Sequence, residues 1–191
     1  MAQNILICGV GGQGTVLAAK VISQAALAEG KKVLSAETIG MAQRGGSVTS
    51  HVRIGDDVFS PMIPSGQADL IIAFEASEAV RNIGYLKHGG TAVINTKIIQ
   101  PTTASLTGKT FEIDMMLGYL EKIGAKIIAV DADSISAKIG NSKTANMVLL
   151  GTASRTGVVS KAELLSAIKV LVKPDFYELN VKAVNEGEKA F

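Results

Sequence analysis

The feature that most constrains this chain is a glycine-rich loop that directly follows its first apolar segment. Residues 4–8 read Asn-Ile-Leu-Ile-Cys and predict a buried strand, and the Ala-rich pattern over 15–29 predicts a helix. The loop between them fits the G-x-G-x-x-G spacing and consists of Gly9, Val10, Gly11, Gly12, Gln13 and Gly14. A strand, a glycine turn and a helix in this order form the first half of a βαβ unit. The backbone N–H groups that open such a helix make an anion site.

The loop has two interpretations on these residues alone. In the first, it holds the phosphates of a dinucleotide, and Glu37 at the end of the second predicted strand is the acid that such sites place about 20 residues further on. In the second, the glycines serve only the tight turn and the close packing of helix against strand, and the loop binds nothing.

The rest of the chain alternates between strand and helix patterns and becomes helical after residue 133. Further strands are predicted at 33–37, 47–54, 70–74, 90–95, 111–113 and 126–131, with 58–60 as a hairpin partner of 47–54. Further helices are predicted at 76–86, 115–123 and 142–154, followed by two helices after the capping box at Ser160. This pattern predicts a single domain over 1–191. It is a three-layer, Rossmann-like α/β core with a mostly parallel sheet (1–140) and a C-terminal helical extension (141–191).

Composition and charge argue against several classes of function. The net charge of +2 is small and scattered, so neither nucleic acid nor an anionic membrane is an expected partner. No apolar run approaches the roughly 20 residues of a membrane span, and the chain enters a strand at once without a secretory signal, which predicts a cytoplasmic protein. Cys8 is the single cysteine and His51 and His88 lie far apart, so neither an iron–sulfur cluster nor a metal site is expected here.

Three further groups of residues are candidates for a ligand site or an interface. A glycine-bracketed loop at the carboxyl end of a strand contains Met41, Gln43, Arg44, Gly45 and Gly46. The Arg44 guanidinium suits bidentate binding of a phosphate, a carboxylate or a partner's acid, and the alternative is a solvated loop arginine.

The other two groups have equally plain alternatives. His51 and Arg53 either extend the same surface or form the wet face of an edge strand. Met41 with 61–64 forms either an apolar docking patch or a cap on the sheet. The side chains that either line the crevice or cap helices are Glu75, Asn95 and Asn146.

Several of these motifs, in this order, resemble the gamma-type subunit of 2-oxoacid:ferredoxin oxidoreductases. The residues that carry the resemblance are 9–14, 40–48, 50–55, Ser60-Pro61, Ile63-Pro64, 69–75, Gly140-Asn141, Asn146 and Leu150-Gly151. Within the family, the Met-Ala-Gln-Arg-Gly-Gly sequence at 41–46 is most similar to the beta subunit of the indolepyruvate-oxidising members. The resemblance covers nearly the whole chain.

The resemblance implies an accessory subunit, inactive alone, of an enzyme that oxidatively decarboxylates a 2-oxoacid with coenzyme A and reduces ferredoxin. Thiamine diphosphate and iron–sulfur clusters would lie in partner subunits, because this chain lacks cluster cysteines and a Gly-Asp-Gly motif. On this view the chain contributes no identified catalytic residue and holds no cofactor alone. Its glycine loop then meets a coenzyme A phosphate or a partner backbone, or serves packing only.

Two other classes of function stay open. One is a free-standing Rossmann-type oxidoreductase that binds NAD or FAD through the glycine loop and Glu37. The other is a purely structural assembly subunit. For self-association a symmetric homodimer is the expected form.

Overall fold

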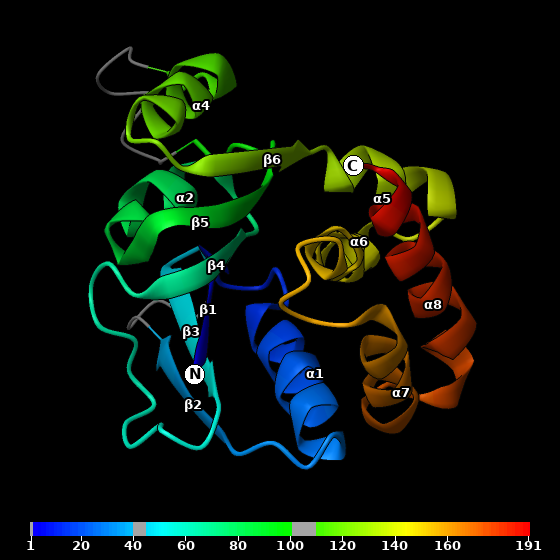
Figure 1. Ribbon diagram of the computed structural model, residues 1–191. Coiled ribbons are helices and arrows are strands. Elements are labelled where there is room, and N and C mark those ends of the chain that lie inside the picture. Colours follow the sequence, from blue (N-terminus) through cyan, green and yellow to red (C-terminus); the bar gives the residue numbers. More distant parts are fainter. Residues whose placement is uncertain (1, 40–44, 101–109) are drawn as a thin grey trace.

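The computed structural model describes residues 2–39, 45–100 and 110–191, which form one six-stranded sheet with helices on both faces (Figure 1). The strand order is β2-β3-β1-β4-β5-β6. The strands are β1 (Gln3–Val10), β2 (Val33–Ile39), β3 (Ser47–Ile54), β4 (Ala68–Ala73), β5 (Leu86–Asn95) and β6 (Lys126–Val130). The helices are α1 (Thr15–Ala28), α2 (Ala76–Asn82), α4 (Ile113–Lys122), α5 (Ala132–Ile139), α6 (Ala145–Ser154), α7 (Lys161–Leu171) and α8 (Pro174–Lys189). None of these helices combines the length and the apolar character needed to cross a membrane.

The sheet is mostly parallel, as predicted, but the place of one strand differs from the expectation. β1, β4, β5 and β6 pair in parallel, while β3 is antiparallel to both β1 and β2. The alternation of polar residues in 47–54 was interpreted as the wet face of an edge strand. β3 instead lies inside the sheet, and His51 is only 1% exposed because neighbouring loop residues cover it. The edge position belongs to β2.

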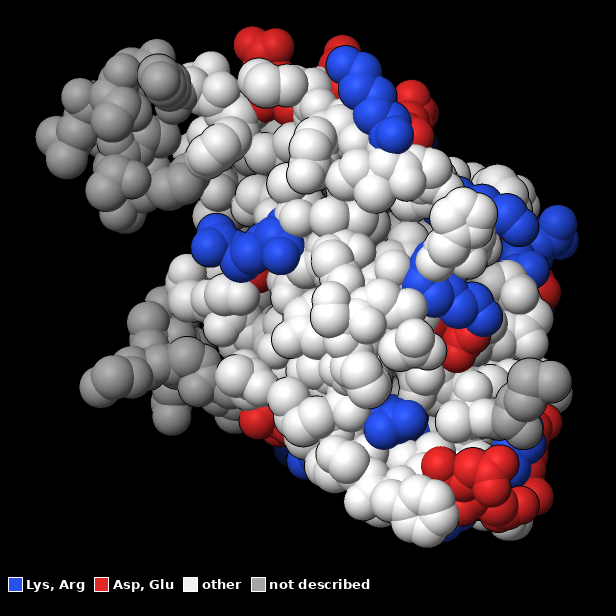
Figure 2. Space-filling view, turned by 60° about the vertical axis from the view of Figure 1, so that its left-hand side comes forward, with Lys and Arg blue, Asp and Glu red and all other residues white. Residues whose placement is uncertain are grey.

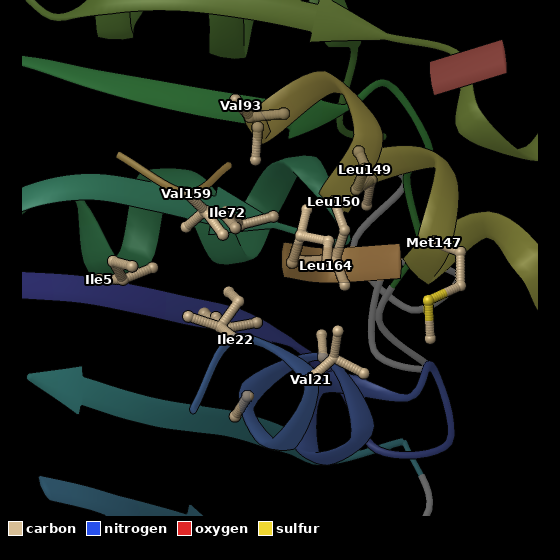
Figure 3. Packing of buried hydrophobic residues seen from close by; sticks show 14 of the residues in the cluster. Ile5, Val21, Ile22, Ile72, Val93, Met147, Leu149, Leu150, Val159 and Leu164 are labelled. Atoms are coloured by element: carbon tan, nitrogen blue, oxygen red, sulfur yellow. The ribbon is translucent and has the colours of Figure 1, made fainter. Parts of the chain in front are cut away.

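The two faces of the central strands build two separate cores, which makes the three layers. In β1, Ile5 and Ile7 face a core shared with α1, α6, α7 and α8, whereas Leu6 and Cys8 face a core shared with α2 and α4. Figure 3 shows the larger core, in which Ile5 and Ile72 of the sheet meet side chains from α1, α6 and α7. Strands buried on both faces need continuous apolar runs, and β1 and β4 have them.

Two short strands predicted from the sequence are absent from the described structure. Residues 58–60 pair with no strand, because Arg53 and His51 hydrogen-bond to the backbone of this segment and its continuation. Residues 111–113 lead directly into α4, whose apolar residues Ile113, Met116 and Leu120 follow a helical spacing and pack on the second core. The prediction of strand at 111–113 was wrong because three residues are too few to separate the two periods.

The helices after residue 140 form the same layer as α1. α6, α7 and α8 contribute Met147, Leu164 and Val184 to the core that α1 covers. The division of the domain at residue 140 remains a prediction.

Candidate functional site

A cleft of about 380 Å³ opens where the carboxyl ends of the central strands meet the start of α6. It is lined by Gly12, Gln13, Gly14, Leu17, Phe74, Asn95, Lys97, Asp133, Ser142, Lys143, Ala145, Asn146 and Leu149. α1 leaves β1 toward one face of the sheet, and α2 leaves β4 toward the other. Adjacent parallel strands whose helices diverge in this way create the crevice in which open α/β sheets bind ligands.

The glycine loop at the floor of this cleft is shaped by close packing. A Cβ on Gly9 would lie 2.9 Å from the Cβ of Phe74, and Gly12 and Gly14 have φ values of +102° and +86° that favour glycine. A Cβ on Gly14 would also lie 2.8 Å from Nδ2 of Asn146. Packing therefore accounts for these three glycines, yet it leaves the start of α1 open to the cleft.

Hydrogen bonds to neighbouring strands fix the loop. Gln13 Oε1 accepts from the Val10 N–H at 2.7 Å, while its Nε2 donates to the Phe74 carbonyl at 3.0 Å and so ties β1 to β4. The Gly11 N–H donates to the Gly46 carbonyl at 2.8 Å. Gln13 and Gly11 thus have structural partners, but no described side chain caps α1. The first N–H groups of that helix, with the positive end of its dipole, remain available to an anion.

The opposite wall of the cleft carries basic and amide side chains. Lys97 pairs with Asp133, whereas Lys143 is exposed and forms no ion pair within the described part of the chain. Asn95 is fully used, since it donates to Phe74 and Asp133 and accepts from the Ala132 N–H.

Asn146, in contrast, keeps a free hydrogen-bonding group at the same cleft. It is 4% exposed, and its Oδ1 accepts from the Met147 N–H at 2.9 Å. Its Nδ2 has no acceptor among the described residues. The sequence analysis missed Lys97, Lys143 and Asp133. The available signal for Lys97 and Asp133 was their position just after the parallel strands β5 and β6.

Glu75 lies away from the cleft and caps a helix. It is 0% exposed, and its Oε2 accepts from the Glu78 N–H at 2.9 Å and from the Ser77 hydroxyl. Its Oε1 accepts from the Ile99 N–H at 2.9 Å. Of the crevice candidates, Asn95 and Asn146 therefore reach the cleft, and the capping alternative accounts for Glu75.

Cys8 is a core residue. It is 0% exposed, and burial together with the nearby Glu78 and Glu75 carboxylates raises the pKa of its thiol. A buried thiol with a raised pKa does not supply the thiolate that a metal or cluster needs.

His51 and Arg53 hold a surface loop and do not line the cleft. Arg53 donates through Nε to Asn4 Oδ1 at 2.8 Å and through NH1 to the carbonyls of Ser60 and Met62. His51 Nδ1 accepts from the Ile63 N–H at 3.2 Å. Both side chains therefore fix the segment 58–64, in which Ile63 is buried and Met62 is 44% exposed. Met41, Gln43 and Arg44 lie outside the described residues.

The hydrogen bond at His51 predicts a pH dependence of stability. Burial lowers the pKa of His51 below 6.5, and the accepting Nδ1 requires the neutral ring. The unfolded chain binds a proton near pH 6.5 while the folded chain does not, so we expect the free energy of unfolding to fall as the pH is lowered from 6.5 toward about 5. Urea denaturation across this range measures the slope.

A matched variant separates His51 from the other groups that titrate. His51→Asn removes the titrating ring and is expected to flatten the slope between pH 6.5 and 5, while His88→Asn, at an exposed position, is expected to leave it. Equal slopes in His51→Asn and the parent chain would contradict this assignment.

The position of Glu37 does not fit a dinucleotide site. Glu37 lies opposite Ser50 of β3, which in turn lies opposite Ile7 of β1. A whole strand therefore separates this acid from the strand that carries the glycine loop. The reading of Glu37 as a ribose-binding acid fails because the insertion of β3 between β1 and β2 is invisible to sequence spacing.

Comparison with known proteins agrees with the fold. The family model described as pyruvate ferredoxin/flavodoxin oxidoreductase matches residues 4–190. The chain is 41% identical to the indolepyruvate oxidoreductase subunit IorB of Thermococcus kodakarensis, over 98% of this chain and 95% of the relative. It is 32% identical to the pyruvate/ketoisovalerate oxidoreductases common subunit gamma of Thermococcus litoralis, over 94% and 91%. The gamma subunit of a keto/oxoacid ferredoxin oxidoreductase from Geobacter sulfurreducens superposes with a TM-score of 0.72 at 28% identity, over 98% of both chains.

Proposed function

This chain belongs to the pyruvate ferredoxin/flavodoxin oxidoreductase family as a gamma-type subunit of a multi-subunit complex, and we propose that it binds the phosphates of coenzyme A there. The complex would convert a 2-oxoacid, coenzyme A and two oxidised ferredoxins into an acyl-CoA, CO2, a proton and two reduced ferredoxins. The identity of 41% to an indolepyruvate oxidoreductase subunit supports an aryl 2-oxoacid as the substrate of the complex.

The observation that carries this proposal is the set of hydrogen-bond donors around the cleft. The uncapped start of α1, the amide Nδ2 of Asn146 and the ammonium of Lys143 line one opening. Together they offer several N–H donors and a positive charge, the pairing that phosphates require. The only carboxylate that lines the cleft, within the described residues, is that of Asp133, and it is paired with Lys97.

The redox cofactors belong, on this proposal, to partner subunits. Thiamine diphosphate supplies the electron sink for decarboxylation, and iron–sulfur clusters accept the electrons singly. This chain does not fit a cluster, because its single thiol, Cys8, is buried with a raised pKa. Its own contribution is to bind and orient a phosphorylated co-substrate and to exclude water around it.

The segment 58–64 is our candidate for a surface that partner subunits contact. Phe59 is 88% exposed and Met62 is 44% exposed, while Arg53 and His51 fix the backbone between them. A preorganised loop with exposed apolar side chains loses little entropy when a partner covers it. Arg44 remains a proposed anion-binding or partner-binding residue on its sequence context.

The charge distribution supports a protein partner over nucleic acid. Figure 2 shows basic side chains scattered singly over one face, with broad uncharged surface between them. A homodimer and a cytoplasmic location stay predictions of the sequence.

Charge reversal at the cleft tests the proposed function in the assembled complex. Asn146→Asp keeps the Oδ1 acceptor for Met147 and replaces the free Nδ2 donor by a negative oxygen. We expect the KM for coenzyme A to rise about tenfold or more with little change in kcat, since a charge-assisted hydrogen bond is lost and a repulsion is added. Steady-state kinetics with coenzyme A as the varied substrate measures both constants.

Control variants separate the alternatives. Asn185→Asp, on α8 away from the cleft, is expected to leave both constants unchanged. Unchanged kinetics in Asn146→Asp would favour a subunit that serves assembly only. Tight, saturable binding of NADH or FAD to the chain would favour the free-standing oxidoreductase.

A further inference from the structure

A second hollow of about 290 Å³ continues the cleft between α6 and α8. The two hollows share Leu17, Lys143 and Asn146, so a ligand that begins at the glycine loop can extend into the second without leaving the surface. We propose that this second hollow is a subsite for the planar ring of an adenine nucleotide whose phosphates lie at the glycine loop. The proposal rests on the proposed function of the first cleft and adds the chemical identity of the rest of the ligand.

Three asparagines line the second hollow, and each has one end of its amide fixed by the protein. Asn146 Oδ1 accepts from the Met147 N–H, and Asn141 Oδ1 accepts from the Lys143 N–H at 2.9 Å. Asn180 has the opposite orientation, because its Nδ2 donates to the Phe176 carbonyl at 2.7 Å. These bonds decide which end of each amide is left over.

The leftover groups are two donors and one acceptor. Nδ2 of Asn141 and of Asn146 and Oδ1 of Asn180 have no partner among the described residues. Asn146 and Asn180 are only 4% and 8% exposed. Buried amide groups are normally paired, so unpaired groups that line one hollow indicate a ligand with complementary groups.

Adenine has the complementary edge. Its 6-amino group donates, and its ring nitrogens accept, which is why amide side chains bind adenine by a donor and an acceptor together. Hypoxanthine carries a carbonyl oxygen in place of the 6-amino group and would face Asn180 Oδ1 with another acceptor. The hollow should therefore distinguish the two rings.

The remaining walls suit a flat apolar ring. Val172 and Leu179 line the hollow, and Phe176 lies at its rim with 49% of its surface exposed. An aromatic side chain at the rim of a hollow offers a stacking surface for a base.

Binding of adenine and inosine nucleotides to the full chain tests the proposal. Isothermal titration with ADP, IDP and inorganic pyrophosphate is expected to give an affinity for ADP about tenfold higher than for either of the others, since stacking and the amide pairing each add to phosphate binding. Equal affinities for ADP and IDP, or for ADP and pyrophosphate, would overturn the ring subsite. Pyrophosphate that binds while ADP gains nothing leaves the proposed function intact, whereas failure of pyrophosphate itself removes the phosphate site.

Variants localise the effect. Phe176→Leu is expected to weaken ADP binding about fivefold to tenfold and leave pyrophosphate binding unchanged, while Phe191→Leu, a matched change at an exposed position outside both hollows, should alter neither. Asn180→Leu is expected to abolish the preference for ADP over IDP, and circular dichroism checks that α8 is retained. A preference that survives Asn180→Leu would contradict the assignment of the acceptor.

Parallel titrations identify the source of the nucleotide. Coenzyme A and ATP share the adenine ring and differ in the attached phosphates and pantetheine arm. Tighter binding of coenzyme A identifies the co-substrate as the occupant, and tighter binding of ATP identifies a free nucleotide. Failure of both to bind more tightly than pyrophosphate would overturn the subsite.

Discussion

Replacing Gly187 with alanine is expected to lower the free energy of unfolding by about 2 kcal/mol or more, although alanine is the better helix former. A Cβ on Gly187 of α8 would lie 1.9 Å from the carbonyl oxygen of Val148 on α6, and one on Gly151 would lie 2.1 Å from the carbonyl oxygen of Val184. Backbone cannot give way like a flexible side chain, so the helices must move apart. Overpacking of this kind costs about 3 kcal/mol, which exceeds the gain of about 1 kcal/mol from helix propensity.

Urea denaturation of the chain measures this loss, and α4 offers a matched control. Gly118 also lies within a helix, and a Cβ there would meet no atom within 4 Å. Gly118→Ala is therefore expected to stabilise the chain by about 0.5 to 1 kcal/mol. A stabilised Gly187→Ala would contradict the close contact of α6 and α8, to which Thr152 also contributes by donating to the Gly187 carbonyl at 2.8 Å.

Truncation of the Glu75 side chain is expected to cost about 3 kcal/mol. This carboxylate is completely buried and accepts from the Glu78 N–H, the Ser77 hydroxyl and the Ile99 N–H, so it caps α2 and anchors the segment after β5. Glu75→Ala leaves these donors without an acceptor in a site that water reaches poorly. Hydrogen bonds to charged groups are the stronger ones, which places this loss above that of an ordinary N-cap.

Chemical denaturation compares this variant with two others. Glu75→Gln keeps one acceptor oxygen and is expected to lose less than Glu75→Ala. Glu121→Ala, at an exposed position of α4, is expected to change stability by no more than about 0.5 kcal/mol. A loss below about 1 kcal/mol in Glu75→Ala would indicate that water replaces the carboxylate.

Much of the fold could be predicted because local patterns record burial. The apolar runs of β1, β4 and β6, the glycine turn before α1 and the capping box at Ser160 each depend on residues close in sequence. The order of the motifs also identified the family, which the match over residues 4–190 confirms. Failures came where strand and helix periods cannot be separated, as at 111–113, or where side chains replaced a strand partner, as at 58–60.

The sequence by itself determined the α/β class, the place of the phosphate-binding loop and the absence of cluster ligands, since each follows from residue types at short spacing. Only the tertiary structure decided that β3 separates Glu37 from the glycine loop and that Gly187 of α8 meets Val148 of α6. It also placed Asn180 beside the hollow that Asn146 lines. These relations join residues far apart along the chain, and which distant segments become neighbours is set by the packing of whole helices and strands.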